Sequence, residues 1–136
     1  MLYKLMDQGY GEAEDFNCAE KILYGANEVY NLGLDKKALK LSAGFGGGMG
    51  IGSVCGALTA SVMVLSHLFV EEKSHESTKI KKLSKQLLDK YEKEMGSIDC
   101  RPLMIAHRTK EIKCKNVIVV AARILDEIIE NERKNS

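Results

Sequence analysis

The sequence has a single proline, Pro102, and little β-branched alternation, so long helices are the expected secondary structure. It also lacks an excess of charge of one sign, because 20 Lys and Arg stand against 19 Asp and Glu. The net charge of +1 gives no general attraction to nucleic acid, so we expect no nucleic-acid partner. Hydrophobic residues make up 45% of the 136 residues, which is typical of one globular domain spanning residues 1–136.

The chain also lacks a recognisable export signal or membrane span. Its first residues, MLYKLMDQGYGEAEDF, are too polar and acidic for a signal peptide. The longest apolar run, residues 54–70, is at the short limit for a bilayer span and is polar in its middle, so it predicts a buried helix. We therefore expect a cytoplasmic protein that is not embedded in a membrane. In a reducing cytoplasm, cysteines are more often ligands or catalytic thiols than permanent disulfides.

Apolar residues recur at spacings of three and four along most of the chain, which predicts an all-α fold. We expect an irregular bundle of four to five helices, with a glycine-rich loop before the central helix. The segment 97–110 contains the proline and is expected to be irregular, with at most one short helical turn. The expected helices cover residues 14–31, 35–43, a central helix capped by Ser53 that reaches Phe69, 78–95 (ended by Gly96), and 111–131.

The segment GFGGGMGIG, residues 44–52, is the one strongly biased stretch. A phosphate-binding loop is excluded because Ser53 stands where that motif requires lysine, and no G-x-G-x-x-G is present. One interpretation is a tight connection between close helices. The other is a loop that frames the next cysteine, with backbone N–H groups forming an anion-binding nest. The candidate loop residues are Gly47, Gly48, Gly50 and Gly52.

The four cysteines are Cys18, Cys55, Cys100 and Cys114, and none lies in a C-x2-C pair. A zinc ribbon, a thioredoxin-like dithiol and a haem attachment motif are therefore absent. Each cysteine lies at or next to the start of an expected helix, where unpaired N–H groups favour the thiolate. The alternative is that they are buried small hydrophobic residues. We interpret the four as one site of redox thiols or metal ligands, with Cys55 as the expected low-pKa thiol and His107 as a possible additional ligand or proton donor.

Four segments of the chain resemble a known family of bacterial and archaeal redox-active proteins, named for its cysteines and its C-G-A-x-x-G motif. They are FNCAE around Cys18, SAGFGGGMGIGSVCGALTA around Cys55, GSIDCRPL around Cys100 and KCKNVIVVAARIL around Cys114. The last motif glycine is Ala60 here, a small-for-small change that is compatible with close helix packing. The resemblance implies redox chemistry at the four cysteines, a link to membrane transporters, and electron transfer, since related domains are fused to cytochrome modules.

Three functions fit these features. Four thiolates could hold a [2Fe–2S] cluster for electron transfer or redox sensing. Without a cofactor, the cysteines could cycle between dithiol and disulfide. Zinc could use the same four thiolates in an adaptor module linked to a transport system. A redox partner protein is expected in the first two cases, and the exposed glycine loop would suit a homodimer.

Overall fold

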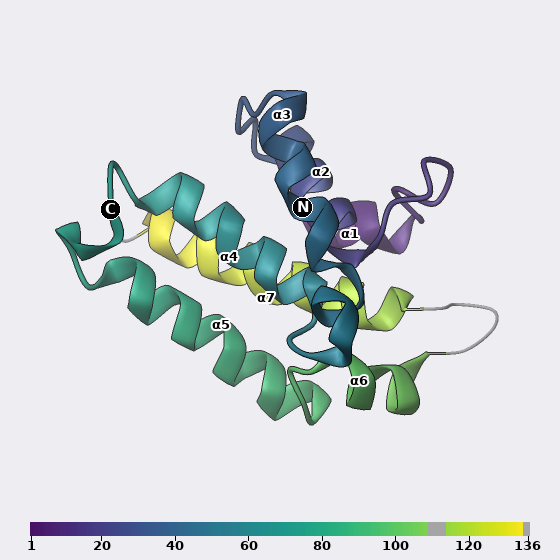
Figure 1. Ribbon diagram of the computed structural model, residues 1–136. Helices are drawn as coiled ribbons and strands as arrows, with labels where there is room; N and C mark the ends of the chain where they lie inside the picture. Colours follow the sequence, from purple (N-terminus) through teal and green to yellow (C-terminus); the bar gives the residue numbers. More distant parts are fainter. Residues whose placement is uncertain (109–113, 135–136) are drawn as a thin grey trace.

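The computed structural model describes residues 1–108 and 114–134, and this part of the chain is all-α, as the sequence predicts (Figure 1). The longer helices are α2 (Cys18–Val29), α4 (Gly56–Phe69), α5 (Lys79–Met95) and α7 (Lys115–Lys134). The shorter elements are α1 (Leu2–Asp7), α3 (Lys36–Leu39), α6 (Cys100–His107) and the single turns η1 (Lys40–Phe45), η2 (Gly48–Gly52) and η3 (Ser74–Glu76). Within residues 1–108 and 114–134, no helix combines the length and the apolar character needed to cross a membrane.

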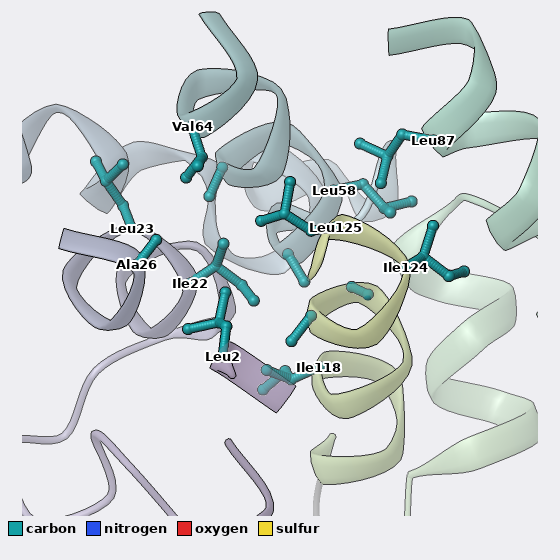
Figure 2. Packing of buried hydrophobic residues seen from close by; sticks show 14 of the residues in the cluster. Leu2, Ile22, Leu23, Ala26, Leu58, Val64, Leu87, Ile118, Ile124 and Leu125 are labelled. Carbon is teal, nitrogen blue, oxygen red and sulfur yellow. The ribbon is translucent and has the colours of Figure 1, made fainter. Parts of the chain in front are cut away.

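Helix α4 is central in the bundle, with α2, α5 and α7 packed against it (Figure 1). Figure 2 shows Ile22 of α2, Leu58 of α4, Leu87 of α5 and Leu125 of α7 gathered in one interior, where all four are fully buried. Each such side chain contributes about 1.5–3 kcal/mol of transfer free energy. The core therefore ties together helices from the whole length of the chain.

Small residues allow α2 and α4 to approach closely where both helices begin. A Cβ atom added at Gly56 would lie 3.2 Å from Cβ of Ala19 and 2.7 Å from the carbonyl oxygen of Phe45. Ala60 is fully buried one turn further along α4. The close contact brings the first turns of the two helices together, and with them two of the cysteines.

Helix α2 begins at Cys18 rather than at residue 14, so the expected start was four residues early. Asn17 caps the helix: its side chain accepts a hydrogen bond from the amide of Glu20, whose carboxylate in turn accepts one from the amide of Asn17. This reciprocal capping box satisfies two N–H groups at the helix start. Asp15 has a positive φ of 59° and belongs to the turn before the helix.

Helix α1 was not expected from the sequence, and a residue far away in the chain stabilises it. The backbone amides of Leu2 and Tyr3 donate hydrogen bonds of 3.1 and 2.9 Å to the carboxylate of Asp126 on α7. The hydroxyl of Tyr30 donates a third hydrogen bond to the same carboxylate. Asp126 is fully buried and acts as a cap supplied from another helix, which a local sequence pattern does not reveal.

Other boundaries also differ from expectation. Helix α2 ends at Val29 rather than 31, and the helix expected over residues 35–43 is α3 followed by η1. The central helix is capped by Cys55 and not by Ser53. Within the segment 97–110, helix α6 occupies Cys100–His107, so this part is helical rather than irregular, and residues 109 and 110 lie outside the described residues. Pro102 is tolerated in the first turn of α6, where N–H groups have no helical partner. Helix α7 runs to Lys134 rather than 131, and the expected start at residues 111–113 lies outside the described residues. Helix α5, ended by Gly96 with a φ of 89°, is confirmed within one residue.

Candidate cysteine site

All four cysteines lie at the beginning of a helix, as the sequence predicts. Cys18 and Cys100 are the first residues of α2 and α6, and Cys55 is the N-cap of α4. Cys114 directly precedes α7, and its carbonyl oxygen accepts a hydrogen bond from the amide of Ile118 at 3.1 Å. These positions place each sulfur near backbone N–H groups that no helical carbonyl satisfies.

Cys18, Cys100 and Cys114 line one pocket of about 290 Å³. This volume is at the lower end of the range for ligand sites, so it fits a group the size of a few side chains rather than a nucleotide. Cys55 does not line the pocket and is only 3% exposed. The pocket is completed by Glu12, Asp15, Phe16, Asn17, Lys21, Gly47, Met104, Arg108 and Ile118.

A short antiparallel contact links the segments that carry Cys55 and Cys100. The amide of Cys55 donates to the carbonyl of Ile98 at 2.8 Å, and the amide of Cys100 donates to the carbonyl of Ser53 at 2.6 Å. Val54 and Asp99 form the bridge between them. The backbone therefore sets the positions of these two cysteines relative to each other.

The glycine-rich turn packs against both η1 and α6. Gly48 has a φ of 62°, and a Cβ atom there would lie 2.4 Å from the carbonyl oxygen of Ser53 and 2.8 Å from Cβ of Cys100. A Cβ at Gly52 would lie 3.0–3.2 Å from atoms of Arg101, while at Gly50 it would meet nothing within 4 Å. The turn thus borders Cys100 more closely than Cys55, the residue it was expected to frame.

The sequence profile of the family described as "Putative redox-active protein (C_GCAxxG_C_C)" matches residues 16–128. The chain belongs to this family. The match includes all four cysteines and confirms the resemblance seen in the sequence. No curated protein and no solved structure matches the chain.

Two of the family cysteines, Cys18 and Cys114, form a hydrogen-bonded pair with opposite pKa shifts. The hydrogen bond from Cys18, aided by the positive charges of Arg108 and Lys21, lowers the pKa of Cys114 from 9.0 to about 6. The same hydrogen bond, together with burial and the neighbouring Cys55, raises the pKa of Cys18 far above its usual value. The directions of the two pKa shifts favour a state in which Cys18 keeps its proton and Cys114 carries the negative charge.

The expectation that Cys55 has the low pKa was wrong. Burial raises the pKa of Cys55 to about 11, although interactions with the amides of Ala57 and Leu58 at the start of α4 act in the opposite direction. Burial and the neighbouring Cys114 also raise the pKa of Cys100. A helix N-terminus favours the thiolate, but the loss of solvent around Cys55 is the larger effect.

Several neighbours of the pocket were missed in the sequence. The thiol of Cys100 donates to the sulfur of Met104 at 3.5 Å, a pair at the i,i+4 spacing of one helix face. Lys21 lies one turn after Cys18 and forms a 2.6 Å ion pair with Glu12. The i,i+3 and i,i+4 spacings could have identified Lys21 and Met104 once the helices were known.

His107 does not line the cysteine pocket. Its Nε2 lies 3.3 Å from the carbonyl oxygen of Met95, and Nε2 of His67 lies 2.8 Å from that of Leu32. Both rings thus contact backbone carbonyls. Within residues 1–108 and 114–134, no group of three or more His, Cys, Asp or Glu side chains is arranged to hold a metal ion.

Proposed function

We propose that this protein is a metal-free thiol–disulfide oxidoreductase in which Cys114 attacks a disulfide and Cys18 resolves the product. The observation that carries the proposal is the hydrogen-bonded pair of Cys18 and Cys114 at a pocket. Membership of a redox-active family supports the same class of chemistry. One thiolate and one adjacent thiol that keeps its proton are what dithiol exchange requires.

The reaction balances within the pair and its substrate disulfide. The Cys114 thiolate attacks one sulfur of the substrate, the substrate S–S bond breaks, and a mixed disulfide forms as the first thiolate leaves. Cys18 then loses its proton to that leaving thiolate or to water and attacks the Cys114 sulfur. The second substrate thiolate departs, so the substrate gains two electrons while Cys18 and Cys114 become one disulfide. The reverse sequence oxidises a substrate dithiol.

The surroundings of the pair assist this cycle. Loss of the hydrogen bond from Cys18 lowers the stability of the Cys114 thiolate, so the pair is most reactive while Cys18 is protonated. Lys21 and Arg108 line the pocket and favour negative charge on the attacking sulfur. Cys100 lines the same pocket with a raised pKa, and we assign it no covalent role in the cycle. The chemistry fits a reducing cytoplasm and a disulfide-bearing partner protein.

The test is to oxidise the reduced protein with a stoichiometric small disulfide, then count free thiols and map the bridge by peptide mass spectrometry. We expect two of the four thiols to disappear and the bridge to join Cys18 to Cys114. Cys18→Ser should accumulate the mixed disulfide on Cys114, and Cys114→Ser should not react. Cys55→Ala is the matched control, expected to react as the natural protein does. A bridge that excludes Cys114 contradicts the proposal.

A four-thiolate centre, with a [2Fe–2S] cluster or zinc, is a second candidate favoured by one observation. All four cysteines start helices, and three of them share a pocket. Among the described residues no three such side chains are arranged to hold a metal ion, so this centre would require the cysteine side chains to move closer together. Protein purified without oxygen separates the candidates: iron and sulfide with absorbance that dithionite bleaches favours the cluster, and bound zinc favours a structural site.

A further inference from the structure

Three large apolar side chains are exposed beside the cysteine pocket, on η2 and α6. Met49 is 43% exposed, Ile51 69% and Ile105 82%. Arg101 connects them: its Nη2 donates to the carbonyl oxygen of Ile51 at 3.4 Å, and Ile105 follows it by one helical turn. We call Met49, Ile51, Arg101 and Ile105 the turn–α6 surface. Helix α6 supplies Cys100 and Met104 to the pocket, and Gly48 of η2 packs against Cys100.

Folding does not account for these side chains. Met49 has a φ of 60°, a backbone conformation that glycine adopts with less strain, and its side chain is not part of the core. Ile51 and Ile105 likewise remain outside the core cluster of the described residues. Apolar groups that gain nothing from burial within the chain, grouped on one surface, indicate an interaction site.

Most charges on the segments that form and flank the turn–α6 surface are positive. Positions 40–56 and 99–108 contain Lys40, Arg101 and Arg108 against one acidic residue, Asp99, in a chain whose total charge is nearly balanced. The acidic residues at the pocket, Glu12 and Asp15, come from the turn before α2. A partner that binds the turn–α6 surface therefore contacts apolar side chains flanked by positive charge. A complementary partner surface has an apolar centre surrounded by carboxylates.

We propose that the turn–α6 surface docks an acidic redox partner protein, whose carboxylates surround apolar side chains and whose disulfide or dithiol reaches the adjacent pocket. This inference rests on the proposed function, because the surface and the pocket share η2 and α6. A second copy of the chain is a poorer occupant, since a symmetric contact would bring together two surfaces of the same, mainly positive charge. An anionic membrane is also a poorer occupant, because it would cover a pocket that must admit a disulfide.

Binding is tested apart from the chemistry, with two peptides in which serine replaces the reactive cysteine. One has the order Asp, Leu, Ser, Leu, Glu and the other Lys, Leu, Ser, Leu, Lys. In an NMR titration of the reduced full chain, we expect the acidic peptide to shift amide signals of η2 and α6 and to bind about tenfold more tightly. The preference should shrink at high salt. Arg101→Glu should reverse it, and Ile51→Ser with Ile105→Ser should weaken the acidic peptide about fivefold.

Leu41→Ser is the matched control, because Leu41 is 67% exposed but lies on η1, outside the turn–α6 surface. Equal binding of the two peptides, or shifts confined to other elements, overturns the docking proposal. Two other results also overturn the docking proposal. One is saturable binding to phosphatidylserine vesicles and the other is a dimer in sedimentation, in each case if the Ile51→Ser and Ile105→Ser substitutions abolish it. A parallel assay with neutral bis(2-hydroxyethyl) disulfide tests the proposed function alone, so the two failures are distinguishable.

Discussion

All four cysteines start helices, but Cys18 and Cys114 differ from Cys55 and Cys100 in the interactions that link each pair. The first two are linked to each other through their side chains, and their pKa values move in opposite directions. The other two are linked through a backbone bridge, and both pKa values rise. A helix N-terminus by itself is therefore not enough to activate a thiol. The hydrogen bond from Cys18 distinguishes Cys114 from the other cysteines, and burial opposes ionisation of Cys55.

The largest expected difference between the pairs is in thiolate content at neutral pH. With a pKa of about 6, Cys114 is about 90% ionised at pH 7, whereas Cys55, with a pKa of about 11, is ionised in about one molecule in 10⁴. Alkylation followed by mass spectrometry should show Cys114 reactivity rising through pH 6 and level by pH 8. Cys55 should react only in strong alkali, and equal labelling of both at pH 7 would remove the distinction.

A substitution at Gly48 tests the backbone packing that positions Cys55 and Cys100. Replacing Gly48 with Ala places a Cβ against Ser53 and Cys100 at a positive φ, so we expect a loss of about 2–4 kcal/mol in the free energy of unfolding. Gly50→Ala is the matched control, because its φ is also positive but no atom lies within 4 Å; about 1 kcal/mol is expected. Urea unfolding measures both, and equal losses would show that packing on Cys100 does not matter.

The Cys18→Ala substitution tests the hydrogen bond between Cys18 and Cys114. Without the donor, the pKa of Cys114 should rise from about 6 toward its usual value, so that alkylation at pH 7 slows by tens of fold. The positive charges of Lys21 and Arg108 remain and limit the rise. Cys100→Ala is the control and should leave the pH midpoint of Cys114 near 6. An unchanged midpoint in Cys18→Ala would mean that these charges alone stabilise the thiolate.

A smaller effect is expected from Tyr91, which lies near Cys18, Cys55 and Cys114. Its hydroxyl donates to the carbonyl of Val117 at 3.0 Å in the first turn of α7, and burial, followed by the nearby Cys55, raises its pKa. Tyr91→Phe should cost about 1 kcal/mol in thermal or urea unfolding. Tyr10→Phe, which removes an exposed hydrogen bond to Glu28, should cost about 0.5 kcal/mol or less. A larger loss for Tyr10→Phe would contradict this ranking.

Sequence patterns identified the long helices well because each has an extended apolar stripe and a local stop signal. Helix α5, with Gly96 at its end, is the clearest case. The patterns missed α1 and α6, since helices of six and eight residues contain too few turns for a stripe to be distinct. Pro102 also favoured an irregular segment, although a proline in the first helical turn removes no hydrogen bond.

The sequence by itself determined that the chain is helical, that it belongs to a four-cysteine family, and that each cysteine starts a helix. These properties depend on local periodicity and motifs. Only the tertiary structure decided that Cys114, and not Cys55, carries the lowered pKa, because burial and the hydrogen bond from Cys18 arise between segments distant in sequence. The same holds for Asp126, whose role at α1 exists only after α7 has packed beside it.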